Sequence, residues 1–215
     1  MNMIRLHMFS DRIEAGKLLA EKLNIKDDCI VLAIPRGGVV VGEQIAQKLG
    51  CKLDIVVSKK ITPPDHPEYG IGAIMHDGTI YWNLDMTGYL NNPYIVNEIS
   101  TKKNEAQRQL DALRRNTTYD LNDKTVILVD DGIATGSSVF VILKWLEKQN
   151  TKKIIVAAPV IPDTTYEQIK KKCDTVTALL IPSAFYSVSD YYENFKQVSE
   201  DEVESILSKY KKAQG

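Results

Sequence analysis

The chain has 215 residues, of which 44% are hydrophobic and 26% are charged, and its formal net charge is -1. This length suits one domain with a sizeable core, and the near-zero charge gives no bulk attraction to nucleic acid or to a membrane surface. No apolar run reaches the length of a membrane span, and the three cysteines lack any metal-binding spacing. We therefore expect a cytoplasmic protein in a reducing environment, without membrane or nucleic-acid partners.

The first predicted elements alternate between helix and strand. Ser10 can cap a helix whose apolar residues extend to Leu23. Strands are predicted over 29–34 and 53–57, with a helix from about 41 to 49 between them. A strand, a helix and a second strand in this order predict a right-handed parallel crossover.

The middle of the chain predicts a hairpin and then a long polar helix. The Asp77-Gly78 pair favours a tight turn, and it separates the apolar runs 71–75 and 79–83. A helix is expected from Pro93 to about Arg115.

The second half alternates again between strands and helices. Its predicted elements are a strand that ends at Val129, a helix after Ser137, a strand over 153–160, a helix around 164–172, a strand over 175–181 and a final helix over 201–211. This order predicts an α/β fold with an open, mostly parallel sheet flanked by helices, in a single domain over 1–215. In such sheets, ligands bind beyond the carboxyl ends of the strands.

The most informative motif is the run VILVDDGIATGSS, residues 126–138. A buried strand ends in two carboxylates, Asp130 and Asp131, and a turn of small residues leads into a helix. Backbone N–H groups at such a turn favour a phosphate, assisted by hydroxyls from Thr135, Ser137 and Ser138. The two aspartates repel a phosphate and suit neutral ribose hydroxyls or a hard cation such as Mg²⁺. The pattern therefore indicates a site for a ribose 5-phosphate.

A second anion-binding pattern follows the first predicted strand. The turn Pro35-Arg36-Gly37-Gly38 combines a guanidinium fork with glycines that permit close approach to a phosphate. Paired lysines follow the next strand, and Lys60 is the preferred candidate to face a diphosphate. Because all of these segments follow the carboxyl ends of strands, we expect them to converge on one rim of the sheet.

These residues resemble the type I phosphoribosyltransferases, whose motif for 5-phosphoribosyl diphosphate (PRPP) is an apolar strand, two acids and a Gly/Thr-rich turn. Both acids, Thr135 and Gly136 match, and Ser138 stands where the family usually has threonine. The blocks AIPRGG, HPEYGIGAI, VDDGIATG and FYSVSDYYENF resemble a bacterial and archaeal group of phosphoribosyltransferases whose acceptor is not settled. This resemblance covers about residues 9–207.

The resemblance implies transfer of the 5-phosphoribosyl group from PRPP to an unidentified nitrogenous acceptor, with release of pyrophosphate. It implies Mg²⁺ held mostly by ligand and water, with no dedicated protein cage and with Asp130 and Asp131 as candidate ligands. These two acids and Lys60 are the expected catalytic residues. The expected PRPP-binding residues are Arg36, Gly37, Gly38, Asp130, Asp131, Gly132, Ala134, Thr135, Gly136, Ser137 and Ser138.

The resemblance also places an acceptor pocket in a C-terminal hood over about 181–212. There Phe185 or Tyr186 can stack on a planar base and Asp190 can accept a hydrogen bond, although an aromatic cluster that packs the last helix explains the segment equally well. Ala134 stands where 6-oxopurine enzymes have an aspartate for proton transfer, which argues against that mechanism. The region of about 60–83 is expected to form a lid or a structural hairpin.

Two alternatives stay open from the sequence. A PRPP-sensing regulator would keep the fold without transferase activity, but the chain shows neither a basic face nor a helix-turn-helix segment before Cys29. A phosphate-binding α/β protein acting on another phosphorylated ligand is the other alternative. A homodimer is also compatible with the sequence.

Overall fold

The computed structural model describes residues 8–63, 70–83, 92–114 and 117–211. By its internal contacts the chain separates into two compact units. The sheet unit contains 1–55, 121–135 and 151–215, and the hairpin unit contains 56–120 and 136–150. Within the described ranges, no helix combines the length and the apolar character needed to span a membrane.

The sheet unit is built on five parallel strands in the order β2-β1-β6-β7-β8. Their bounds are Cys29–Ala33 for β1, Lys52–Ile55 for β2, Thr125–Val129 for β6, Lys153–Val160 for β7 and Thr175–Leu180 for β8. Every residue of β1 and β6 is buried, as expected for central strands that are covered on both faces. This parallel sheet confirms the predicted fold class.

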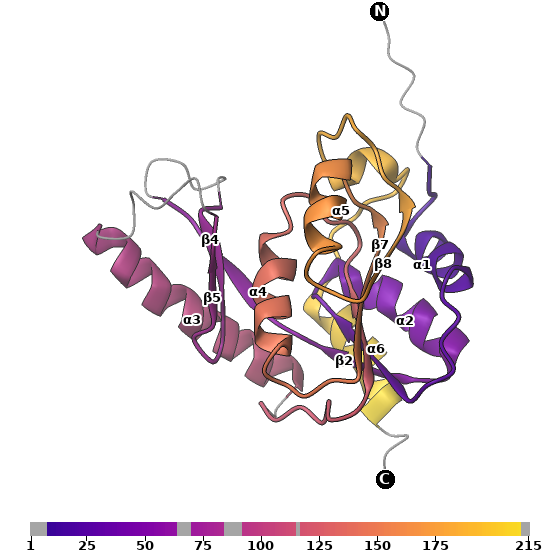
Figure 1. The fold of residues 1–215 in the computed structure, drawn as a ribbon, viewed down its shortest axis with the longest axis horizontal. Coiled ribbons are helices and arrows are strands. Elements are labelled where there is room, and N and C mark those ends of the chain that lie inside the picture. The colour runs from indigo at the N-terminus through magenta and orange to yellow at the C-terminus, as the bar shows by residue number, and fades with distance from the viewer. Residues whose placement is uncertain (1–7, 64–69, 84–91, 115–116, 212–215) are drawn as a thin grey trace, which may run out of the picture. The chain divides into compact units, whose positions relative to one another are not determined.

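Helices cover both faces of this sheet. Helices α1 (Arg12–Glu21) and α2 (Gly37–Leu49) pack against each other on one side, and α5 (Asp163–Ile169) lies on the other side (Figure 1). Helix α6 (Glu200–Lys211) packs on α2 and β2. The apolar side chains of α2, such as Val39, Val41 and Ile45, are fully buried.

The N-terminal segment and the C-terminal tail lie side by side in the sheet unit. Phe9 pairs with Tyr192 in an isolated parallel bridge, and the Glu193 amide donates to the Phe9 carbonyl at 2.8 Å. The tail reaches this point after the 3-10 helix η2 (Val188–Tyr191). Residues 8–9 and the predicted hood therefore form one local structure.

The hairpin unit is an antiparallel sheet in the order β3-β4-β5, with a helix on each side (Figure 1). Its elements are β3 (Ser58–Ile61), β4 (Gly72–Met75), β5 (Ile80–Trp82), α3 (Pro93–Arg114) and α4 (Ser137–Leu146). The predicted turn is confirmed, since the Asp77 carboxylate accepts hydrogen bonds from the amide and hydroxyl of Thr79. Residues 64–69 of the expected lid lie outside the described residues, so the lid stays a prediction, as does the single domain over 1–215.

Three predicted boundaries differ from the structure. Helix α2 begins at Gly37 rather than near residue 41, so the two glycines form its first turn. Strand β2 ends at Ile55, and the following residues start the separate antiparallel sheet. Asp11, not Ser10, caps α1, because its side chain accepts a hydrogen bond from the Glu14 amide at 2.9 Å.

The cap assignment predicts that Asp11→Ala lowers the free energy of unfolding, while Ser10→Ala leaves it nearly unchanged. Loss of a side-chain cap costs about 0.5–2 kcal/mol. The free energy of unfolding in urea measures both variants. Equal losses in the two variants would show that the cap is not at Asp11.

Candidate active site

The candidate site lies where β1 and β6, neighbours in the sheet, end at the same edge. The pairing continues past the strands, because the Ile34 amide donates to the Val129 carbonyl at 2.8 Å. The next residues are the Pro35–Gly38 turn on one side and Asp130 and Asp131 on the other. The expected convergence of the arginine-bearing turn and the twin acids is therefore present within the sheet unit.

The two glycines of this turn permit the close approach of the two loops. A Cβ added to Gly37 would collide with the Asp131 carboxylate and would lie 2.7 Å from Arg12 Nε. A Cβ added to Gly38 would lie 2.9 Å from the Val129 carbonyl oxygen and 3.0 Å from Asp130 Cα. Side chains at these positions would therefore separate the turn from the acids.

Arg36 occupies the N-cap position of α2, and the peptide bond that precedes it is cis. Arg36 is partly exposed, and its guanidinium has no hydrogen bond or ion pair with any residue in the described part of the chain. Five N–H donors are therefore available there for an anionic ligand.

Asp131 is held in place by contacts to three of its groups. Its Oδ2 accepts a hydrogen bond from Arg12 Nε at 2.6 Å, and the side chains of this ion pair are only 15% and 10% exposed. Its amide donates to Asp130 Oδ1 at 2.8 Å, and its carbonyl accepts from the Tyr192 hydroxyl at 2.6 Å. A buried, charge-assisted pair of this kind fixes the orientation of the carboxylate.

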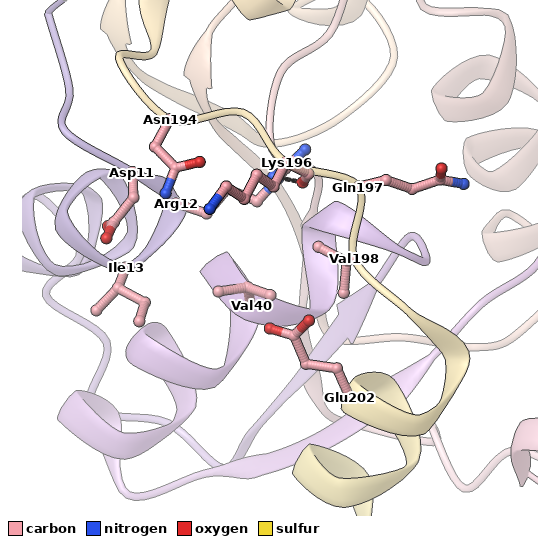
Figure 2. A pocket seen from close by; sticks show the side chains of 9 residues that line it. All are labelled: Asp11, Arg12, Ile13, Val40, Asn194, Lys196, Gln197, Val198 and Glu202. Atoms are coloured by element: carbon pink, nitrogen blue, oxygen red, sulfur yellow. Dashed lines mark hydrogen bonds between the residues drawn. The ribbon is translucent and has the colours of Figure 1, made fainter.

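Arg12 is itself enclosed by the C-terminal tail. Its guanidinium carbon lies 3.8 Å from the centroid of the Phe195 ring. Its Nη1 donates to the Lys196 carbonyl at 2.8 Å (Figure 2). Arg12 also lines a cavity of about 320 Å³, together with residues of α1, α2, the tail and α6. Figure 2 shows the side chains around this space, with Ile13 and Val40 on one side and Asn194 and Lys196 on the other.

Asp130 differs from Asp131 in its electrostatic environment. Burial raises the pKa of Asp130 well above its ordinary value, and the neighbouring Asp131 charge raises it further. The Arg12 charge acts in the opposite direction but is outweighed. The two acids therefore divide into one carboxylate paired with arginine and one carboxyl group that readily keeps its proton.

Residues 132–135 of the motif over 126–138 are anchored to the sheet unit. The Ile133 amide donates to the Val160 carbonyl at 3.0 Å, and the Ala134 carbonyl accepts from the Thr165 hydroxyl at 2.7 Å. Val188 of the tail packs on Gly132, where an added Cβ would lie 2.8 Å from Val188 Cγ2. Ala134 and Thr135 are exposed at the end of this segment.

Residues 136–138, at the end of the motif, belong to the hairpin unit. Gly136 adopts the left-handed conformation with φ 76°, and its carbonyl accepts from the Phe140 amide as α4 begins at Ser137. Glycine is favoured there because other residues are strained in this conformation. Ser137 is buried and Ser138 is partly exposed. Lys60 lies within β3 of the same unit, with an exposed side chain, rather than at the end of a parallel strand.

The predicted acceptor residues lie on the segment that follows β8. The Phe185 ring stacks on Tyr191 with centroids 5.8 Å apart, whereas Tyr186 is 86% exposed. Asp190 lies in η2 and is partly exposed. One of the two aromatic candidates therefore already has an aromatic partner in the protein.

The sequence interpretation missed Arg12, Tyr192 and Phe195. Arg12 lies 119 positions before Asp131 and stands just inside a helix start, where no motif singles it out. The two aromatic residues belong to a tail that was interpreted as an acceptor pocket or as packing for the last helix, and not as support for the twin acids. Among the described residues, no group of three or more His, Cys, Asp or Glu side chains could hold a metal ion.

The chain is similar to known proteins over most of its length. The model of the phosphoribosyl transferase domain matches residues 11–196. The chain belongs to the phosphoribosyl transferase domain family. It is 32% identical over 209 residues to "Putative phosphoribosyl transferase Rv0571c" of Mycobacterium tuberculosis H37Rv, which covers 95% of this chain and 47% of that protein.

A solved structure shares both the fold and the length of this phosphoribosyl transferase domain. The protein TT1426 from Thermus thermophilus is 33% identical, with a TM-score of 0.78, over 94% of this chain and 98% of that chain. The chain spans about half the length of the curated relatives that it matches.

The partly buried Asp130 predicts an unusual dependence of stability on pH. Its pKa is higher in the folded than in the unfolded chain, so between these two values the folded state binds the extra proton. Stability should therefore fall as the pH rises through this window. Asp130→Asn, which stays neutral, should be more stable than the wild type at neutral pH and similar to it near pH ~4.

Urea unfolding at several pH values measures this difference. Asp123→Asn is the matched control, because Asp123 is exposed and its left-handed backbone, with φ 56°, tolerates asparagine. A constant stability difference between Asp130→Asn and the wild type across the pH range would argue against a raised pKa at Asp130.

Proposed function

We propose that this phosphoribosyl transferase domain transfers the 5-phosphoribosyl group of PRPP to a nitrogenous acceptor and releases pyrophosphate. The observation that carries the proposal is the close packing of the arginine-bearing turn against the twin acids in the sheet unit. This rim offers cationic donors and carboxylate acceptors side by side, which is what a sugar diphosphate requires.

The diphosphate is assigned to Arg36, Gly37 and Gly38. The guanidinium of Arg36 has no protein partner among the described residues, and the first N–H groups of α2 follow it directly. A helix N-terminus and a guanidinium fork both favour phosphate oxygens. The absence of side chains at the two glycines leaves the backbone accessible to a ligand.

The ribose hydroxyls are assigned to Asp130 and Asp131, and the flanking Gly132 keeps this part of the loop small. The paired carboxyl groups also fit a hard cation, which would reach the site with the diphosphate and would neutralise part of its charge. Asp131 Oδ2 is occupied by Arg12, and the other oxygen of this carboxylate is assigned to a ribose hydroxyl.

The 5-phosphate is assigned to the turn from Ala134 to Ser138. Its support is the sequence pattern together with the left-handed Gly136 at the start of α4, a ten-residue helix whose first N–H groups have no intrahelical partners. Thr135, Ser137 and Ser138 supply hydroxyl donors.

The reaction needs no covalent intermediate on the protein. The acceptor nitrogen forms a bond to C1 of the ribose while the C1–O bond breaks, and the electron pair leaves with pyrophosphate. Positive groups near the departing oxygen stabilise the charge that develops there, which is the role proposed for Arg36. Ala134 cannot take the acceptor's proton, so the proposed acceptor loses that proton to solvent or to its own basic site.

The acceptor pocket is assigned to Phe185, Tyr186 and Asp190. The exposed ring of Tyr186 can stack on a planar acceptor, and Asp190 can accept from an N–H group. Phe185, already stacked on Tyr191, would contribute to this pocket through packing. A cytoplasmic location and a small-molecule acceptor complete the proposal.

The diol assignment predicts that Asp130→Asn combined with Asp131→Asn abolishes PRPP binding while the fold survives. Two neutral amides cannot replace the Asp131 carboxylate as an acceptor or neutralise a cation that accompanies the diphosphate. Calorimetric titration of PRPP with Mg²⁺ measures the affinity, and circular dichroism checks the fold. Near-normal affinity in the folded double variant would refute the roles of the acids.

The diphosphate assignment predicts a different pattern for Arg36→Ala. This change should weaken pyrophosphate binding more than ribose 5-phosphate binding, because only the former uses the guanidinium. The loss should be on the order of 10-fold or more, as for a charge-assisted hydrogen bond. Equal losses for the two ligands would contradict the separate subsites.

The proposed reaction is tested by incubating the protein with PRPP, Mg²⁺ and a panel of nitrogenous bases, amines and water. Release of pyrophosphate that depends on one acceptor class supports the transferase. PRPP binding without release for any acceptor favours a PRPP-sensing regulator, and a preference for another phosphorylated ligand in a thermal-shift comparison refutes the PRPP assignment.

A further inference from the structure

We propose that Arg12, which lies outside every motif of the chain, is a positioning residue that fixes the Asp131 carboxylate for recognition of the ribose. The inference rests on the proposed function and deepens it. It assigns the geometry of the twin acids to a side chain from α1 and to the C-terminal tail that encloses it.

The first step is the orientation of Asp131. Its Oδ2 is bound by Arg12 Nε at 2.6 Å, and the lack of a side chain at Gly37 makes room for this pair. The Asp131 carboxylate also shares a side-chain hydrogen bond with the neighbouring Asp130 carboxyl group. Arg12 therefore holds one oxygen of the Asp131 carboxylate, and this pair keeps the two acids in one arrangement in which they can accept from ribose hydroxyls.

The second step is that Arg12 cannot easily move. The guanidinium stacks on Phe195 at 3.8 Å and donates to the Lys196 carbonyl at 2.8 Å, and the side chain is 10% exposed. The planar fork makes these two hydrogen bonds and the stacking contact at once, which a lysine ammonium cannot do. The geometry therefore requires arginine and not only a positive charge.

The third step is that the tail holds both the side chain and the backbone of Asp131. Tyr192 is 1% exposed, and its hydroxyl donates to the Asp131 carbonyl at 2.6 Å. The tail thus contacts Asp131 directly through Tyr192 and indirectly through Arg12. The hood segment and the diol site are therefore mechanically connected.

The ligand that responds to Arg12 is defined by this geometry. Ribose 5-phosphate and PRPP both carry the diol, whereas pyrophosphate carries none. Loss of Arg12 should therefore weaken the binding of ribose 5-phosphate and PRPP and leave the binding of pyrophosphate unchanged. A general loss of structure would weaken the binding of all three ligands together.

The cavity beside Arg12 offers a chemical test of the same claim. Arg12 lines a space of about 320 Å³ that is also bordered by Ile13, Val40 and Lys196 (Figure 2). Truncation of Arg12 to alanine would extend this space towards Asp131. A small guanidinium ion could then enter and restore the pair with Asp131, whereas an ammonium ion of similar size lacks the fork.

The experiment compares Arg12→Ala and Arg12→Lys with the wild type by calorimetry against PRPP with Mg²⁺, ribose 5-phosphate and pyrophosphate. We expect about 10- to 100-fold weaker binding of the two ribose ligands in Arg12→Ala, as for loss of a charge-assisted hydrogen bond, and unchanged pyrophosphate binding. Arg12→Lys should show the same pattern with a smaller loss. Methylguanidinium should restore ribose binding to Arg12→Ala, and methylammonium should not.

Arg114→Ala is the matched control. Arg114 also stacks on an aromatic ring, Tyr119 at 3.9 Å, and donates to a backbone carbonyl, that of Thr118 at 2.7 Å, but it lies in the hairpin unit. Its loss should leave the three affinities unchanged. If Arg12→Ala does not fold, Arg12→Lys and Tyr192→Phe carry the comparison, and Tyr192→Phe should weaken only the ribose ligands.

The inference and the proposed function fail in different ways. If the wild type does not bind PRPP, the proposed function is refuted. If the wild type binds PRPP but folded Arg12 variants lose all three ligands equally, or lose none, the inference is overturned. Rescue by methylammonium as effective as rescue by methylguanidinium would also overturn it, because charge alone would then suffice.

Discussion

The candidate site depends on the close contact between two loops that leave neighbouring parallel strands. Strands β1 and β6 pair in register along their whole length, and the pairing extends to Ile34 and Val129. Gly37 and Gly38 then lie against the twin acids at distances that no side chain could accommodate. Because of this contact, a cationic turn and an acidic turn share one rim without neutralising each other directly.

The second constraint is that two adjacent carboxyl groups lie in different electrostatic environments. Two like charges side by side in a partly buried site are costly unless a cation or a proton compensates one of them. Arg12 compensates Asp131 through a short ion pair, and burial favours the protonated form of Asp130.

The sequence predicted the alternating elements and the two loops because both leave clear patterns. Parallel strands such as 125–129 are continuous apolar runs, and the acids and glycines follow them directly. The start of α2 was misplaced because glycines are poor helix formers, and their packing against Asp130 and Asp131 overrides that preference. Arg12 and Tyr192 could not be predicted, because their contacts with Asp131 span 119 and 61 positions and follow no local spacing.

The central claim, that the arginine-bearing turn and the twin acids form one cradle for a sugar diphosphate, is tested most directly by a crystal structure with PRPP and Mg²⁺. The account predicts the diphosphate on Arg36 and the N–H groups of Gly37 and Gly38. It also predicts the ribose hydroxyls on Asp130 and Asp131, with Arg12 still paired to Asp131. Density for the ligand away from this rim, or a ribose that contacts neither acid, would contradict it.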